Sequence, residues 1–395
     1  MKSLTIIGLV VAASVCRAQS TTLEQALMLA RSNRPAIKAS QLSIDRARLS
    51  ANALSTYPGP TLGIGQSSRT GLGATDQDFF VSQPIDLFGR TSSSRTLGRT
   101  QLKLAEAEQR AVLLAVQSEV LKSYFEALSS TRLSEVSDEL LKVATSLHQA
   151  TKRRLEEGKI PEIQFTRATI ELDRAKQAAT LRKSQLRAAL KRLAGAVGSD
   201  AELNSVDNAA ALSAPEVDLG NRPDLLILSS QAEVAQSEAR VASRLLMPDL
   251  ELTGLRSPWR ERDTNFGLRL QLSWRFDFGR GRSEQSASIK AVEAIQASLA
   301  DARKRAESEL AAIDIEIEAA ESSVKAFESI RSSASELVSK TQTGFSSGFS
   351  TLLDVLEATR SLREIEQELV EAELSLNLAI TKKYEIAGTL IEVAK

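Results

Sequence analysis

Side chains that commonly carry out catalysis are scarce in this sequence. His148 is the only histidine and Cys16 the only cysteine among 395 residues, and no group of His, Cys, Asp and Glu has metal-ligand spacing. Nucleophilic catalysis needs an activated nucleophile beside a base. His148 lies in a charged stretch that is typical of a helix surface or a helix seam. We therefore expect no enzymatic activity, no metal centre and no cofactor.

Two carboxylates remain as candidates for an ion-binding role. Asp354 and Glu357 lie three residues apart near the predicted start of a helix, so their side chains share one face. Acidic residues at this place commonly form a solvated surface that favours the helix dipole. The alternative is a negatively charged lining, which attracts cations where several copies surround a passage.

The elements that position these residues occur twice, at an offset of 190 residues. Phe88-Gly89-Arg90 returns as Phe278-Gly279-Arg280, and Gly158 returns as Gly348. Each half reads as helix, β-hairpin, long helix and return helix. In the first repeat (19–205) the helix, after the leader, spans about 22–56, the hairpin 61–87, the long helix 90–157 and the return helix 162–194. In the second repeat (206–395) the corresponding ranges are 222–246, 249–277, 281–347 and 351–387.

The long helices define a mainly α fold with a small β part. Neither contains proline, and a helix of about 67 residues reaches roughly 100 Å. Apolar or small residues recur every three or four positions in the second one, which is the spacing of an antiparallel coiled coil. These positions are Leu299, Ala302, Ala306, Leu310, Ile313, Ile317, Ala320, Val324 and Phe327. Gly89 and Gly279 allow the backbone to bend where strand gives way to helix.

The last predicted strand alternates strictly between apolar and polar residues. Its apolar positions are Phe266, Leu268, Leu270, Leu272 and Trp274. A strand of about twelve residues, tilted by about 45°, matches the hydrocarbon thickness of a membrane, with lipid on one face and water on the other. Four strands cannot close a barrel in lipid, so a membrane location requires several copies of the chain. A half-buried strand in a soluble sheet is the alternative.

The N-terminus predicts export. Residues 1–18 have a basic start, an apolar run and small residues near the end, which is the layout of a secretory signal peptide. Cys16 raises the question of lipidation, but the bulky Val15 before it disfavours that modification. After this segment no apolar run is long enough for a membrane-spanning helix. The formal net charge is zero, so nothing indicates nucleic-acid binding.

The chain resembles the TolC-type outer-membrane efflux proteins. The resemblance is carried by the duplicated element order, by "VSQPIDLFGR" and "LSWRFDFGR" before the long helices, and by "GFSTLLDVLEA" after the second one. It implies a homotrimer that embeds a shared twelve-stranded β-barrel in outer-membrane lipid and extends an α-barrel tunnel across the periplasm. It also implies two partners, a periplasmic adaptor (membrane-fusion protein) and an inner-membrane transporter of RND, ABC or MFS type.

The same resemblance implies roles for particular residues. Asp354 and Glu357 would form an acidic ring at the periplasmic aperture, and the turns at Gly158–Pro161 and Gly344–Gly348 would dock the adaptor. Some family members have a tyrosine and an arginine that hold the mouth shut, where this chain has Phe345 and Ser350.

The implied function is the exit duct of a tripartite efflux or type I secretion system. The compact chain, which ends at Lys395 without a long polar tail, favours small-molecule or metal-cation efflux. A soluble periplasmic coiled-coil adaptor or scaffold protein is the alternative.

Overall fold

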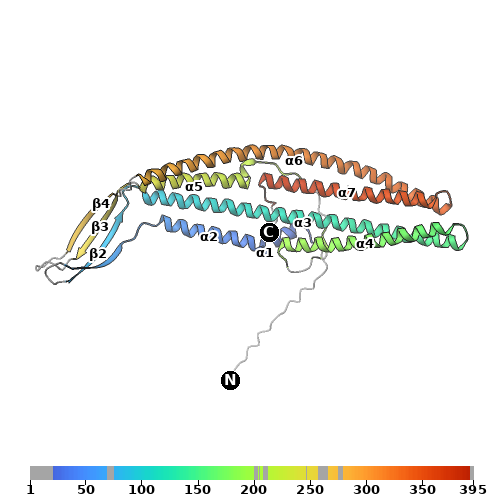
Figure 1. Cartoon of the computed structure of the whole chain (residues 1–395), viewed down its shortest axis with the longest axis horizontal. Helices are drawn as coiled ribbons and strands as arrows, with labels where there is room; N and C mark the ends of the chain where they lie inside the picture. The colour runs from blue at the N-terminus through green and yellow to red at the C-terminus, as the bar shows by residue number, and fades with distance from the viewer. Residues whose placement is uncertain are drawn as a thin grey trace, which may run out of the picture.

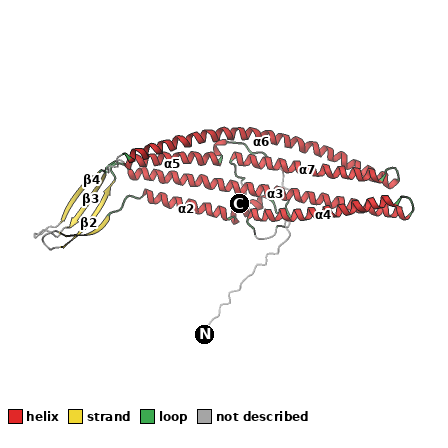
Figure 2. Ribbon diagram, in the orientation of Figure 1, coloured by secondary structure: helices red, strands yellow, loops and turns green. Residues whose placement is uncertain are grey.

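The chain is an elongated molecule with a small sheet at one end and two turns, each connecting a pair of helices, at the other (Figure 1). The computed structural model describes residues 21–68, 75–199, 203, 205–207, 212–245, 247–256, 266–274 and 279–391. Helix dominates these residues, and the strands are confined to one end (Figure 2). The mainly α fold with an internal repeat, predicted from the sequence, is confirmed. The predicted leader and the tips of both hairpins lie outside the described residues.

The first helix of the chain is broken, so the expectation of one helix over 22–56 is wrong. Helix α1 spans Leu23–Asn33 and α2 spans Pro35–Ser55. Arg34 between them is extended, with φ −69° and ψ 117°, because a residue before proline disfavours the helical conformation. Pro35 then occupies the first position of α2, where its missing N–H costs nothing.

Four antiparallel strands form one sheet in the order β1-β2-β3-β4. They span Thr61–Ser68, Thr75–Ile85, Asp249–Arg256 and Phe266–Ser273. The central β2–β3 pair joins the two repeats, with Val81 opposite Gly254. Leu62 lies opposite Val81, and Leu268 opposite Gly254. This register aligns apolar positions of all four strands on one face of the sheet.

The two long helices are α3 (Arg90–Glu156) and α6 (Arg280–Ser347), and each reverses into a return helix, α4 (Glu162–Val197) or α7 (Leu352–Ala387). A short turn of helix, η1 (Leu219–Asn221), precedes α5 (Pro223–Leu245). Helices α2 and α4 follow one another along α3, and α5 and α7 follow one another along α6 (Figure 1). Ala306, Ile313, Ile317 and Ala320 of the predicted seam are buried.

Each return helix ends at the middle of the molecule, against the start of another helix. Glycines with positive φ, Gly198 and Gly388, end α4 and α7. Arg34 donates to the carbonyl oxygen of Gly195 at the end of α4 and forms an ion pair with Glu119 of α3. In the second repeat, Arg222 pairs with Asp224 at 2.8 Å and with Glu309 of α6 at 2.7 Å. An arginine therefore fixes the same junction in both halves.

The main core surrounds this junction in the first repeat. It combines apolar side chains of α1, α3 and α4, and Tyr124 of α3 lies at its centre without exposure. The Tyr124 hydroxyl donates to the carbonyl oxygen of Asp207 at 2.7 Å, and burial raises the pKa of Tyr124 to about 12. This hydrogen bond ties the segment between the repeats to the long helix.

Candidate functional site

The sheet presents an uncovered apolar face. Leu62 and Ile64 of β1, Val81 of β2, and Leu268 and Leu270 of β4 are exposed in the single chain. The predicted lipid-facing residues Leu272 and Trp274 are also exposed. Phe266 pairs with Arg256 at the start of β4, but its side chain lies outside the described residues. The opposite face carries the buried polar residues Ser82 and Thr253, and the ring of Phe80 lies over Gly63 on that same face.

The strand-to-helix transitions depend on two glycines in the left-handed conformation. Gly89 has φ +73° and Gly279 has φ +97°, and each caps the start of a long helix. Asp86 accepts hydrogen bonds from the backbone N–H groups of Arg90 and Thr91 at 2.8 and 2.7 Å, which satisfies donors that the helix itself cannot. The Arg90 side chain forms an ion pair with Asp249 at the start of β3. The transition thus links both hairpins to α3.

At the far end of the molecule, the first turn joins α3 to α4. Gly158 reverses the chain with φ +69°, and Pro161 caps the start of α4. Lys159 pairs with Glu157 at 2.8 Å, and this contact holds the pKa of the Glu157 carboxyl below its usual value. Gly158 and Pro161 therefore lie together at one tip.

The second turn joins α6 to α7 and exposes an aromatic side chain. Gly348 has φ +85°, and the N–H of Phe349 donates to the carbonyl oxygen of Gly344 at 2.8 Å. A side chain at Gly344 would collide with that of Ser350, so glycine permits the tight approach. Phe349 is 92% exposed, whereas Phe345 one turn earlier is buried.

Asp354 and Glu357 lie at this second tip, and both are exposed. The Asp354 carboxylate accepts a hydrogen bond from the N–H of Thr351 at 2.8 Å, and the Thr351 hydroxyl accepts one from the N–H of Asp354 at 3.2 Å. This capping box holds the pKa of Asp354 below its usual value. Asp354 thus has a structural role at the helix start, while no hydrogen bond or ion pair engages Glu357 within the described part of the chain.

An arginine missed by the sequence reasoning joins the two tips. Arg154 of α3 donates to the carbonyl oxygens of Phe345 at 2.5 Å and Ser346 at 3.1 Å, and its guanidinium lies 4.3 Å from the centroid of the Phe345 ring. The cation therefore meets the carboxyl end of α6, where the helix dipole favours positive charge. Lys152 and Arg153 precede it, so no local pattern distinguishes Arg154 from its neighbours.

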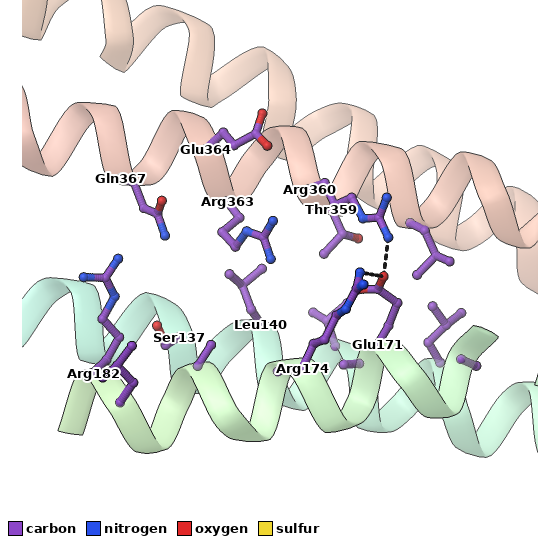
Figure 3. Close-up of a pocket in the computed structure, with 18 of the residues that line it drawn as sticks. Ser137, Leu140, Glu171, Arg174, Arg182, Thr359, Arg360, Arg363, Glu364 and Gln367 are labelled. Atoms are coloured by element: carbon purple, nitrogen blue, oxygen red, sulfur yellow. Dashed lines mark hydrogen bonds and ion pairs between the residues drawn. The ribbon is translucent and has the colours of Figure 1, made fainter. Parts of the chain in front are cut away.

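Above the tips, a groove of 410 Å³ opens between α3, α4 and α7. Figure 3 shows Arg182 extending from α4 and Arg363 from α7 into this space. Glu171 accepts hydrogen bonds from Arg174 at 3.2 Å and from Arg360 of α7. The floor is apolar and includes Leu140 and Leu147 of α3.

The described residues show no arrangement suited to metal binding. No cluster of three His, Cys, Asp or Glu side chains could hold an ion within these ranges. The His148 ring contacts the ring of Phe165 of α4 in a tilted arrangement, with 5.1 Å between ring centroids, which places His148 in the α3–α4 seam. None of the helices in the described ranges combines the length and hydrophobicity needed to cross a bilayer.

Comparison with known proteins identifies the class of protein to which these long paired helices, and this small sheet with its open apolar face, belong. The sequence profile of the outer membrane efflux protein family matches residues 26–199 and 214–389. The chain belongs to this family, and the two matched ranges fall on its two repeats. No curated protein matches the chain significantly.

Solved structures share the fold at low sequence identity. CusC, described as a protein that forms a transmembrane channel, is 18% identical with a TM-score of 0.79, covering 92% of this chain and 91% of CusC. The outer membrane protein VceC of Vibrio cholerae is 17% identical with a TM-score of 0.75, covering 92% and 96%. The outer membrane channel MtrE of Neisseria gonorrhoeae, solved in its open state, is 17% identical with a TM-score of 0.74, covering 93% and 88%.

Proposed function

We propose that three copies of this chain form the outer-membrane exit duct of a tripartite efflux or type I secretion system. In this proposal the sheets of the three copies complete one barrel in the outer membrane, and the helices form a tunnel across the periplasm. Passage is passive, and the energy comes from an inner-membrane transporter of RND, ABC or MFS type.

The open sheet is the observation that carries the proposal. Within the described residues, strands β1 and β4 each have a neighbour on one side only, and the apolar face that they form with β2 and β3 is exposed. Backbone groups at a sheet edge cannot remain unpaired in lipid. Barrels of this kind need about eight strands or more, so four must be supplemented by further copies. A soluble adaptor or scaffold would leave this apolar face in water.

The helical part supplies the length of a periplasmic duct. Helix α3 has 67 residues and α6 has 68, so each spans roughly 100 Å. Both turns lie at the end opposite the sheet (Figure 1). The exposed Phe349 beside Gly348, and the turn at Gly158–Pro161, are the surfaces proposed to meet the periplasmic adaptor.

The acidic tip supports a substrate preference. Three copies would bring six carboxylates, from Asp354 and Glu357, to the periplasmic mouth. Such a ring raises the local concentration of cations and disfavours anions. Small molecules that carry positive charge, or metal cations, are therefore the proposed cargo.

A pair of substitutions on adjacent residues of β4 tests the location of the sheet. Leu270→Asp places a charge on the apolar face, at a cost somewhat below the roughly 2–4 kcal/mol of a basic residue at the bilayer midplane, and should remove the protein from the outer-membrane fraction. Gln271→Asp, on the opposite face, should leave the protein in that fraction with the mass of three chains. Recovery of the unaltered protein as a soluble periplasmic monomer would overturn the proposal.

A further inference from the structure

The groove between α3, α4 and α7 has an excess of positive charge. Four arginines and two glutamates line it, and its other polar side chains are uncharged. Glu171 is engaged by Arg174 at 3.2 Å and by Arg360. Figure 3 shows the second glutamate, Glu364, pointing away from α4. Among the described residues, neither carboxylate pairs with the two remaining arginines of the groove.

Those two arginines, Arg182 of α4 and Arg363 of α7, extend into the groove from opposite walls (Figure 3). Arg182 donates a hydrogen bond to the neutral side chain of Gln185 at 3.0 Å. Arg363 forms no hydrogen bond or ion pair within the part of the chain that the structure describes, and both arginines are half-buried. Removing a charged group from water is unfavourable unless an opposite charge accompanies it. An anion between the two guanidinium groups would therefore be stabilised.

The groove also offers an apolar surface beneath these charges. Leu140 and Leu147 of α3 form its floor, and α4 contributes the small side chains of Ala175 and Ala178, which share one helix face. Because these alanines leave space that larger side chains would fill, a volume of 410 Å³ remains open. This volume is typical of sites for small molecules, which combine an apolar lining with a few polar groups.

We propose that the groove binds a small amphipathic anion, with its apolar body on the α3 floor and its carboxylate or sulfonate between Arg182 and Arg363. The planar donors of arginine suit the paired oxygens of such groups, and the same charges disfavour cations. The groove lies within one chain, so the inference does not rest on the proposed trimer. The bound anion would link α4 of the first repeat to α7 of the second, as Arg360 and Glu171 already do.

Calorimetric titration of the full-length protein with 1-naphthalenesulfonate tests the charge requirement. The neutral 1-naphthalenesulfonamide has the same apolar body, so it should bind roughly tenfold more weakly, because it cannot form charge-assisted hydrogen bonds as an anion does. The cation 1-naphthylmethylammonium should bind no more tightly than the sulfonamide. Equal affinities of the sulfonate and the sulfonamide would overturn the proposal. Absence of sulfonate binding would mean that another protein segment fills the groove, and would overturn it as well.

Substitutions in the groove test its location. Arg182→Gln and Arg363→Gln should each weaken binding of the sulfonate by roughly tenfold, the effect of losing a hydrogen bond to a charged group. Arg187→Gln is the matched control, because it removes an exposed cation of α4 that does not line the groove. Ala178→Leu fills space without changing the charge and should also weaken binding. Losses no larger in Arg363→Gln than in Arg187→Gln would overturn the site.

Hydrogen exchange of the unaltered protein provides a test that needs no variant. The sulfonate should slow exchange in residues 174–185 of α4 and 356–367 of α7, which wall the groove, and leave α5 unchanged. Protection confined to other helices would overturn the proposal. A protein that binds the sulfonate in this way but is recovered as a soluble periplasmic monomer would overturn the duct and leave this site intact.

Discussion

Replacing Arg154 by alanine should loosen the contact between the two helical tips. The substitution removes two hydrogen bonds from a charged donor to the carbonyl oxygens of Phe345 and Ser346, and a cation–π contact with the Phe345 ring. Hydrogen bonds to charged groups contribute roughly 1.5–3 kcal/mol and exposed cation–π contacts roughly 0.5–1 kcal/mol. Since Arg154 is only half-buried, we take about 2 kcal/mol for the whole contact.

Hydrogen exchange measures this loss locally. About 2 kcal/mol corresponds to roughly 30-fold faster exchange at the amides of the last turn of α6, provided that they exchange by local opening. Arg153→Ala is the matched control, because it removes a neighbouring exposed cation that makes no hydrogen bond or ion pair to α6 among the described residues. Arg154→Lys should recover only part of the protection, since lysine lacks the planar fork of donors. Equal exchange in the Arg154→Ala and Arg153→Ala proteins would refute the reasoning.

Three further predictions concern the turns and the acidic tip. Asp354→Asn combined with Glu357→Gln should weaken the preference for cations in single-channel recordings. Unchanged selectivity would show that neither residue lines the pore. Gly348→Ala should lower stability in thermal unfolding by roughly 1–2 kcal/mol because of its positive φ, whereas Gly59→Ala, which meets no atom, should have little effect. Because folding lowers the pKa of Asp354, its capping contribution is complete above the unfolded pKa and is lost as the pH falls through the folded pKa. Protection of the Thr351 amide, corrected for intrinsic exchange, should fall in that range and become independent of pH in Asp354→Asn.

Features that repeat along the chain could be predicted from the sequence. The coiled-coil spacing around Ile313 and the alternation around Leu270 are periodic signals, and each persists over several turns or residue pairs. Gly89 and Gly279 recur at the offset of the repeat, and the left-handed conformation explains why glycine is needed there. Such signals fix the fold class because many residues contribute to each one.

Some features of the structure were not predicted from the sequence, either because a periodic pattern hid them or because they join residues that are far apart in the chain. The helix break before Pro35 was missed because the helical pattern continues on both sides of it, although proline restrains the preceding residue. The contact of Arg154 with Phe345 joins residues 191 positions apart, and Arg154 is one of three consecutive basic residues that the sequence alone does not distinguish. The capping box of Thr351 and Asp354 does have a sequence signal, the Ser/Thr-x-x-Asp/Glu spacing before an apolar run, but Asp354 was considered only for the helix face that it shares with Glu357.

The junctions at mid-length have a mechanical consequence for the mouth of the duct. Each return helix has 36 residues and therefore extends about 54 Å from its glycine terminus to its tip. If a return helix rotated by about 5° about its glycine terminus, its tip would move sideways by roughly 5 Å. Arg34 and Arg222 lie at these two junctions, so in the proposed duct we expect substitutions there to change the width of the periplasmic opening, half a molecule away.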